Sequence, residues 1–349
     1  MLDVEPCRQI VSPHPLEFAG SPRIPGLTYR TYRGPEDLPL LYATQRADVE
    51  GAGGEYTASL EDFIHFYTHL EHCDLQRDCV IAEVEGEIAA FARWFWKYEA
   101  KERQVAYFPM VWVLPRWWRH GLGTALLRHA EEQLRCIASG HGFSDPRVFS
   151  VGVESNQAGR IAVLEAAGYT PVTHYNLMVR SLLENDLPEV PLPEGYEVRP
   201  ATPDHYRPVF DADLRAFLDD HGYDPPNTEQ RYLEWVEGRL FQPERWVVAW
   251  HNGQVAGQVL CFIDALENKK YRRQRGWTED ISVQAEHRGR GLARALLARA
   301  MRNLKEEGMH EAALRVYSEN PFGAYSFYES MGYRVIHYGM VLRKPLETA

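Results

Sequence analysis

Two periodicities of hydrophobic and polar residues alternate along the chain, and they occur in the same order in each half. In the second half, Glu197 to Arg199 predicts a strand, Pro203 starts a helix, and a second helical stretch covers Asn227 to Leu240. A hairpin with its turn at Asn252-Gly253 follows. The last elements are a strand, a long helix, a strand and a short helix: Thr278–Val283, Gly291–Glu307, Ala312–Tyr317 and Gly323–Met331. Each half therefore reads β-α-α-β-β-β-α-β-α-β, which is typical of a mixed α/β fold.

The two halves are also related residue by residue, which indicates a tandem duplication. Residues 113–123 (VLPRWWRHGLG) match residues 283–293 (VQAEHRGRGLA) at an offset of 170 positions. Four further residues recur at an offset of 164: Asn156 and Asn320, Gly159 and Gly323, Gly168 and Gly332, Tyr169 and Tyr333. We therefore expect two domains of one fold, each a central mixed β-sheet flanked by helices.

A proline-rich segment marks the joint between the two copies. Residues 183–194 read LENDLPEVPLPE, and proline continues neither a helix nor a central strand, so we expect a stiff linker. The first domain then covers residues 27–182 and the second residues 195–349. Residues 1–26 contain several prolines and no clear period, which predicts a peripheral N-terminal arm.

Composition supports two globular domains and excludes several other classes. The 349 residues are 45% hydrophobic and 25% charged, which is enough apolar material for two ordinary cores. No run of about 18 apolar residues occurs, so no membrane span is expected. A net charge of −11 argues against a general nucleic-acid binder. Five scattered cysteines and an N-terminus that does not read as a secretion signal favour a cytoplasmic protein.

A glycine-containing turn lies between the strand that ends at Val283 and the helix that begins near Gly291. Small residues let backbone N–H groups approach a ligand, and a helix N-terminus attracts negative charge. The spacing fits neither the Walker P-loop nor the dinucleotide fingerprint. Taken alone, the turn indicates either a pyrophosphate cradle or a tight turn that needs glycine.

The turn and the residues that follow it together resemble the acetyl-CoA-binding motifs of the GNAT N-acetyltransferase superfamily. Those motifs read Val-x-x-x-x-Gln/Arg-x-x-Gly-x-Gly/Ala and then Asn…Tyr-x-x-x-Gly-Phe/Tyr. The residues that match are Val283, Arg288, Gly291, Ala293, Asn320, Tyr328, Gly332 and Tyr333. Because the resemblance extends to both copies, nearly the whole chain looks like a tandem two-domain GNAT protein.

The resemblance implies that the second domain binds acetyl-CoA as its co-substrate. The backbone of six turn residues would hold the CoA pyrophosphate: Arg288, Gly289, Arg290, Gly291, Leu292 and Ala293. The strand edge formed by Ile281, Ser282 and Val283 would hydrogen-bond the pantetheine arm. A separation of neighbouring strands at this point would give the acetyl carbonyl a backbone donor. Asn320 would contact the CoA arm, although a turn-forming asparagine after a strand explains it equally well.

Catalysis needs a base for the amine and an acid for the thiolate. A carboxylate just ahead of the turn can accept the proton, and we favour Glu279, with Asp280 next. On a regular strand Glu279 and Val283 would lie on one face and Asp280 on the other. The resemblance implies Tyr328 as the general acid. The alternatives are a solvated carboxylate pair and an ordinary packed tyrosine.

The first domain lacks these groups at the matching positions. Trp118 stands for Arg288, Pro109 and Met110 for the two carboxylates, and Leu164 for Tyr328. Residues 1–194 also carry a net charge of −10, against −1 for the rest, which disfavours a polyanion such as CoA. We expect this domain to be degenerate, with a structural role, a share in the acceptor pocket, or a regulatory site. Weak CoA binding at Gly121 and Gly123 stays open.

The segment between the first two helices of the second domain lines the acceptor site in GNAT folds, and here it is acidic. Its acidic and histidine residues are Asp211, Asp213, Asp219, Asp220, His221 and Asp224. This suits a cationic primary amine on a small molecule or peptide, such as a polyamine, an aminosugar or a peptide N-terminus, although a solvated helix face explains the charges too. No metal motif occurs among the 14 histidines, so we expect no metal. The sequence predicts an acetyl-CoA-dependent N-acetyltransferase, monomeric or homodimeric, acting by direct attack; the alternative is a non-catalytic acyl-CoA-binding or sensing protein.

Overall fold

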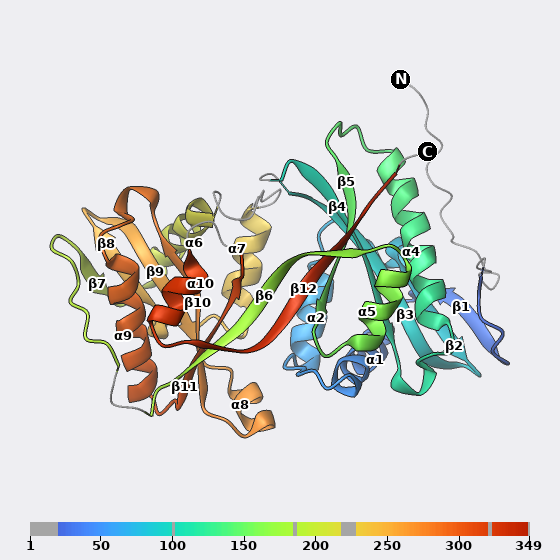
Figure 1. Ribbon diagram of the computed structural model, residues 1–349, viewed down its shortest axis with the longest axis horizontal. Coiled ribbons are helices and arrows are strands. Elements are labelled where there is room, and N and C mark those ends of the chain that lie inside the picture. Colours follow the sequence, from blue (N-terminus) through green and yellow to red (C-terminus); the bar gives the residue numbers. More distant parts are fainter. Residues whose placement is uncertain (1–19, 100–101, 184–186, 218–227, 320–322, 348–349) are drawn as a thin grey trace. The chain divides into compact units, whose positions relative to one another are not determined.

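The structure, a computed structural model, describes residues 20–99, 102–183, 187–217, 228–319 and 323–347 (Figure 1). The predicted order of strands and helices occurs twice. The first repeat contains β1 (Leu27–Thr31), α1 (Leu38–Gly51), α2 (Leu60–Thr68), β2 (Cys79–Val84), β3 (Glu87–Glu99), β4 (Gln104–Val113), α4 (Leu122–Ser139), β5 (Arg147–Glu154), α5 (Ala158–Ala166) and β6 (Thr170–Ser181). The second contains β7 (Glu197–Arg199), α6 (Pro203–Phe217), α7 (Thr228–Glu237), β8 (Val247–His251), β9 (Gln254–Phe262), β10 (Arg275–Val283), α9 (Leu292–Glu306), β11 (Glu311–Tyr317), α10 (Ala324–Ser330) and β12 (Arg334–Pro345). Two short helices are additional: α3 (Leu75–Asp78) and α8 (Ala265–Tyr271).

The chain forms two compact units that exchange their last strands. Unit 1 holds the first repeat up to Val172 together with Gly339–Ala349, whereas unit 2 holds Thr173–Tyr338. In unit 1 the end of β12 pairs antiparallel with β5, and in unit 2 β6 pairs antiparallel with β11. The expected boundaries at residues 182 and 195 follow the repeats in the sequence, but the contacts place the strand β6 of the first repeat in unit 2.

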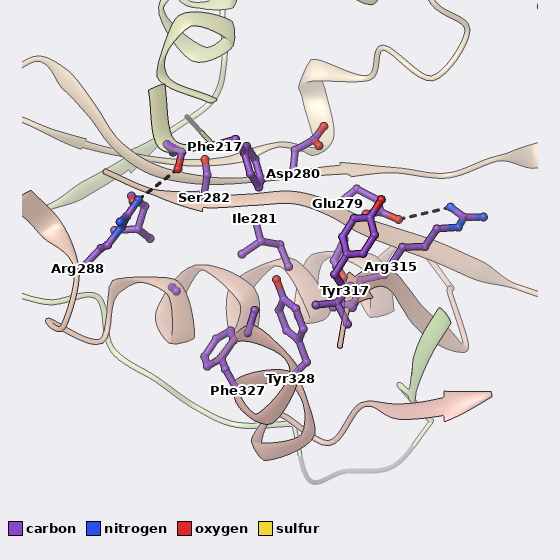
Figure 2. Close-up of a pocket in the computed structure, with 17 residues that line it drawn as sticks. Phe217, Glu279, Asp280, Ile281, Ser282, Arg288, Arg315, Tyr317, Phe327 and Tyr328 are labelled. Carbon is purple, nitrogen blue, oxygen red and sulfur yellow. Dashed lines mark hydrogen bonds and ion pairs between the residues drawn. The ribbon is translucent and has the colours of Figure 1, made fainter. Parts of the chain in front are cut away.

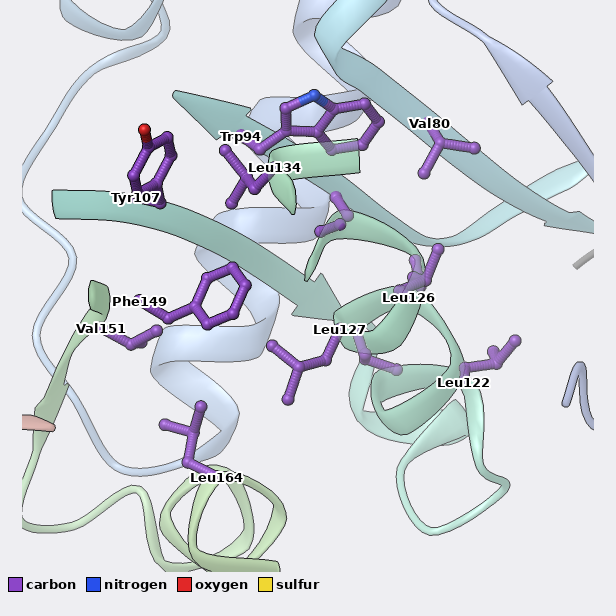
Figure 3. Close-up of a cluster of buried hydrophobic side chains, with 14 of the residues drawn as sticks. Val80, Trp94, Tyr107, Leu122, Leu126, Leu127, Leu134, Phe149, Val151 and Leu164 are labelled. Atoms are coloured by element: carbon purple, nitrogen blue, oxygen red, sulfur yellow. The ribbon is translucent and has the colours of Figure 1, made fainter. Parts of the chain in front are cut away.

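The core of unit 1 lies between its sheet and the long helix α4. One face of α4 is apolar, and its leucines pack onto buried residues of β4 and β5 (Figure 3). Unit 2 repeats this arrangement with α9, whose buried face contacts β8, β9 and β11. The contact is close at Gly276 of β10, where a Cβ atom would lie 2.5 Å from Leu304 of α9. In each unit the glycine turn leads from the end of the strand into this helix: from Val113 to Leu122 in unit 1 and from Val283 to Leu292 in unit 2.

The parallel strands β10 and β11 separate after three residue pairs. The last pair joins Trp277 to Ala313, and the next residue, Thr278, donates its side-chain hydroxyl to the Ala313 carbonyl at 3.1 Å. Tyr333 lies 2.8 Å from the same hydroxyl. We call the opening beyond this point the fork of unit 2. Strands β4 and β5 of unit 1 also pair over three residues, which leaves a matching fork.

A β-bulge in β10 changes the side-chain pattern that the sequence predicts. Glu279 pairs with Leu260 of β9, but the next registered pair begins at Ser282, so Asp280 is an extra residue with a left-handed φ of 46°. Glu279 therefore shares the face of Leu260, which packs toward α6, whereas Val283 packs with the core under α9. The expectation that Glu279 and Val283 lie on one face is wrong for this reason. Strand β4 pairs with β3 without such a shift.

Among the residues that the structure describes, no helix combines the length and the apolar character that a membrane span requires.

Candidate active site

The fork of unit 2 opens into a pocket of about 480 Å³ (Figure 2). Its walls come from β10, β11, the end of α6, the turn before α9, and α10. Eight residues expected at the site line it: Glu279, Asp280, Ile281, Ser282, Val283, Arg288, Ala293 and Tyr328. The fold thus brings the candidate base, the candidate acid and the candidate cofactor strand to one cavity. Asn320 lies outside the described residues.

The turn before α9 has the shape of an anion cradle. Gly289 and Gly291 have left-handed φ angles of 73° and 80°, and no atom lies within 4 Å of the place where a Cβ would be. Among the described residues no side chain caps α9, so none of these side chains competes with a ligand for its first N–H groups. Arg290 is exposed, whereas the side chain of Leu292 is buried in the core, so Leu292 can offer a ligand only its backbone N–H.

Arg288 is turned inward. Its Nε donates to the Val283 carbonyl at 3.0 Å and its Nη2 to the Ala216 carbonyl at 3.3 Å. These bonds tie the turn to the end of β10 and to α6. The side chain of Arg288 therefore holds the shape of the turn, and Arg288 and Ala293 line the pocket at its two ends.

Tyr328 lies on α10, on the far side of the fork from α6. It is 8% exposed, and its hydroxyl points toward Ile281 in the pocket (Figure 2). The C-terminal end of α10 is held by the buried Arg180 of β6, whose Nη1 donates to the Met331 carbonyl. Gly332 leaves room for this guanidinium, because a Cβ there would lie 2.8 Å from its Cζ. A residue of the first repeat thus supports the helix that carries the candidate acid.

Glu279 is a carboxylate that the protein keeps partly desolvated. Its Oε1 is buried without a hydrogen-bond partner and lies 3.6 Å from Nη1 of Arg315, beyond hydrogen-bond distance. Burial raises the pKa of Glu279 to about 8. The charge of Arg315 opposes this, the charge of Asp280 adds to it, and a backbone hydrogen bond from Arg315 lowers the pKa slightly. A carboxylate with such a pKa can accept a proton near neutral pH, as a general base must.

Two more carboxylates lie on the α6 side of the bulge. Asp280 is exposed to solvent at the pocket, yet the protein around it raises its pKa to about 6 by desolvation. Asp213 of α6 accepts hydrogen bonds from Ser282 at 3.0 Å and Gln258 at 2.9 Å. Burial, and then the charge of Asp280, raises the pKa of Asp213 well above its ordinary value. Of the other acidic residues expected here, Asp211 pairs with Arg207 within α6, and Asp219 to Asp224 lie outside the described residues.

Sequence reasoning missed Arg315, which lies beside Glu279. Its guanidinium stacks 4.5 Å from the centre of the Trp277 ring, and its side chain is 58% exposed. Aligning the repeats could have found Arg315, because the first copy has Val151 at this position and the charge is therefore specific to the second copy. Thr278, which closes the ladder at the fork, likewise stands for Phe108.

The fork of unit 1 also forms a pocket, of about 470 Å³, but charged and aromatic side chains occupy its floor. Trp118 makes the bond that Arg288 makes in unit 2, since its Nε1 donates to the Val113 carbonyl at 2.8 Å. The same Nε1 lies 3.0 Å from Asp48. Arg160 donates to the Val111 carbonyl and pairs with Asp48 at 3.2 Å. Ala324 stands at the position of Arg160 in unit 2.

The turn of unit 1 keeps its backbone shape but is covered. Gly121 has a φ of 87°, close to that of its counterpart Gly291. A Cβ on Gly121 would lie 3.3 Å from Pro22 of the N-terminal segment. Arg119 takes the position of Gly289 with a left-handed φ of 63°.

Comparisons with known proteins match both repeats to one family. A model described as acetyltransferase (GNAT) family matches residues 44–169, and one described as acetyltransferase (GNAT) domain matches residues 197–336. A mycothiol acetyltransferase of Pseudarthrobacter chlorophenolicus is 26% identical over 206 residues, which is 58% of this chain and 62% of that protein. A crystal structure of a GCN5-related N-acetyltransferase from Sphaerobacter thermophilus matches with a TM-score of 0.67 and 26% identity, over 92% of this chain and 96% of that one. A tandem GNAT protein from the clavulanic acid biosynthesis pathway shares the fold, with a TM-score of 0.64, 16% identity, and coverage of 93% and 99%.

Proposed function

The chain belongs to the GNAT acetyltransferase family in both of its repeats, and we infer from this and from the two forks that unit 2 transfers an acetyl group from acetyl-CoA to a primary amine. The CoA pyrophosphate binds the backbone of the turn at Gly289 to Ala293. The pantetheine arm runs along Ile281 to Val283, and the thioester lies in the fork.

The reaction is a direct attack of the amine on the thioester. Glu279 accepts a proton from the ammonium group, directly or through water, with Asp280 as the second candidate base. The amine nitrogen then forms a bond to the acetyl carbon, and the bond between that carbon and sulfur breaks. Tyr328 donates its proton to the departing thiolate, so that the products are an N-acetyl amine and CoA.

The observation that carries this proposal is the open fork between β10 and β11 with Glu279 and Tyr328 on its walls. The desolvated Glu279 has the pKa of a base, and Tyr328 points into the cavity. In the α9 turn nothing lies against Gly291. The pocket of unit 1 has a similar volume, but Trp118, Asp48, Arg160 and Leu164 line it in place of these groups.

The test is release of CoA when the full chain is mixed with acetyl-CoA and a panel of amines. We expect a thiol signal with at least one amine and a mass gain of one acetyl group on that amine. Glu279→Gln and Tyr328→Phe should each slow turnover by about 10²–10⁴-fold. Turnover that is unchanged in both variants contradicts the assigned roles.

Calorimetry with CoA distinguishes this proposal from its alternative. Binding of CoA without turnover of any amine would favour a non-catalytic acyl-CoA-binding protein. Gly291→Val provides the matched control for binding, because a β-branched residue is strained at a φ of 80° and would project into the cradle. Loss of CoA binding in this variant places the ligand at the turn of α9.

A further inference from the structure

The pocket of unit 2 has two ends with different chemistry. Figure 2 shows Arg288 and the α9 turn at one end and Arg315 at the other, with Ile281 and Tyr328 between them. Under the proposed function CoA occupies the turn end and extends to the middle. The acceptor amine must then approach from the end that holds Glu279 and Arg315.

Arg315 is set up at that end as an anion-binding group. Stacking on Trp277 at 4.5 Å fixes the plane of the guanidinium. It donates no hydrogen bond to any residue that the structure describes, and its contact with Glu279 is 3.6 Å long. Arg315 lines the pocket, and its stacked guanidinium is open to solvent beyond Glu279. A planar guanidinium held in this way matches a carboxylate, which it can bind through two parallel hydrogen bonds.

Glu279 supplies the complementary half of the site. Its Oε1 is buried and has no hydrogen-bond donor among the residues that the structure describes, which is a costly arrangement that a ligand would relieve. The backbone of Arg315 also acts on this carboxylate and lowers its pKa, less than burial raises it. The ammonium group of an acceptor has three N–H donors and an opposite charge. One ligand that carries both an ammonium and a neighbouring carboxylate would satisfy both residues at once.

We propose that the acceptor is an amino carboxylic acid, which binds Arg315 through its carboxylate and presents its amine to Glu279. This inference rests on the proposed acetyl transfer and narrows its acceptor to a zwitterion. A diamine or polyamine would leave Arg315 facing a second positive charge, which is unfavourable.

The same contact couples acceptor binding to the proton transfer. Arg315 lowers the pKa of Glu279 while the two groups face each other. A substrate carboxylate that takes the guanidinium neutralises this cation, and the pKa of Glu279 rises. The pKa of Glu279 is therefore higher when an acceptor with a carboxylate is bound to Arg315 than when no acceptor is bound, and Glu279 is then the stronger base.

The first repeat supports a role at the site rather than in folding. Val151 stands at the position of Arg315 there, on the corresponding strand β5. Exposed ion pairs contribute little to stability, about 0–1 kcal/mol. The 58% exposure of Arg315 and its long contact with Glu279 place it in that class, so its removal should leave the fold intact.

The experiment compares amino acids with the amines that lack only the carboxylate. Suitable pairs are leucine with isopentylamine and phenylalanine with phenethylamine, with putrescine as a diamine. For each, kcat/KM is measured from CoA release by the full chain. We expect the amino acid of an accepted pair to exceed its amine by tenfold or more, and putrescine to be a poor acceptor.

Variants at Arg315 then separate carboxylate binding from an effect on the base. Arg315→Gln should raise KM for the amino acid and lower the preference by about 10–100-fold, as expected for the loss of a charge-assisted contact. Arg315→Lys should retain part of the preference. The loss of the Arg315 charge changes the pKa of Glu279 in the free protein, and that part acts on both members of a pair and cancels in their ratio. The rise that the substrate carboxylate causes occurs with the amino acid alone, so its loss adds to the fall in the ratio. Arg299→Gln, an exposed arginine of α9, controls for the loss of one positive charge and should leave the ratio unchanged.

Each outcome bears on the inference. Equal use of both members of the accepted pairs, a preference for putrescine, or an unchanged ratio in Arg315→Gln overturns it, while acetyl transfer itself stands. An absence of turnover with every amine, despite binding of acetyl-CoA, contradicts the proposed function and the inference together.

Discussion

The two forks of the molecule have nearly the same backbone but different contents. Both begin after three parallel residue pairs, and both are followed by a glycine turn with left-handed φ angles at its end. In unit 1 the Asp48–Arg160 pair and Trp118 lie in the fork, and Pro22 lies on the turn. In unit 2 the corresponding space is a pocket lined by the candidate catalytic residues.

This difference shows that two kinds of side chain can hold the same backbone turn. Trp118 makes the bond that Arg288 makes to the end of the preceding strand, so the turn keeps its shape although the side chains around it differ. In unit 1 Arg160, which pairs with Asp48, donates a hydrogen bond to the Val111 carbonyl at the edge of β4. The first repeat also retains a task in unit 2, since β6 completes its sheet and brings Arg180 to α10.

The largest expected effect is that of Glu279→Gln, which removes the base of one fork. We expect kcat to fall by about 10²–10⁴-fold. In the native protein kcat/KM should rise with pH through about 8, because only deprotonated Glu279 accepts a proton, and the variant should lose this limb of the profile. Asp48→Asn, which changes the buried carboxylate of the other fork, should leave turnover unchanged.

A thermal-unfolding measurement shows whether a loss of activity in Glu279→Gln comes from the missing base or from a less stable fold. The raised pKa means that folding favours the protonated form, so Glu279 costs stability as pH rises above its unfolded value and approaches 8. Glutamine removes that cost, and Glu279→Gln should melt no lower than the native protein at pH 8. A large fall in Tm, or full activity of the variant, would contradict the role of Glu279.

The second prediction compares the buried arginine that holds the end of α10 in unit 2 with a lysine of unit 1 that pairs with the long helix α4. Arg180 in unit 2 and Lys344 in unit 1 occupy matching positions, and Lys344 pairs with the buried Glu131 at 2.8 Å. Both Arg180→Ala and Lys344→Ala should lower stability, by about 1–3 kcal/mol. The first removes the side chain that donates to the Met331 carbonyl, and the second removes one of the three described partners of the buried Glu131, which keeps Arg135 and Tyr169. Arg180→Ala should in addition lower kcat several-fold by displacing Tyr328.

Rescue identifies this as positioning rather than general destabilisation. Arg180→Lys should restore part of kcat, since lysine can reach the Met331 carbonyl. Lys344→Ala should leave kcat unchanged at a temperature where both variants are folded. Equal losses of kcat in Arg180→Ala and Lys344→Ala would show that the effect is one of stability alone.

The sequence was sufficient to predict the order of elements and most of the pocket. Helical and strand periods are local, and the offset between the repeats fixed the turn and the strand before it. The bulge at Asp280 was not predictable by alternation, because it depends on how β10 pairs with β9. It lies after Glu279 and moves Val283 to the opposite face, so counting back from Val283 assigned Glu279 to the wrong side of the sheet and away from Arg315.

The strand exchange was also beyond the sequence pattern. Both repeats end in a similar strand, and nothing in the local pattern of β6 states which sheet it joins. The pairing of β6 with β11 and of β12 with β5 depends on contacts between residues far apart in the chain. The contribution of Arg180 to unit 2 follows from that exchange, and so it too became visible only in the structure.

The smallest expected effect comes from replacing the charged and aromatic side chains in the fork of unit 1 by those found in unit 2. Arg160→Ala gives the residue found in unit 2, and Trp118→Arg restores the bonding group of Arg288. Asp48 would then lack its partner Arg160, so Asp48→Ala is added. Ala216 of α6 occupies the position in unit 2 that Asp48 of α1 has in unit 1, beside Arg288 and Trp118 respectively. Calorimetry with CoA should show one site in the native chain and a second, weaker site in the triple variant. The second site stays weak because Pro22 still covers Gly121 and because the unit is acidic. Two equal sites in the native protein would show that the side chains in the fork of unit 1 move aside for CoA, and the contrast between the forks would then lie in catalysis alone.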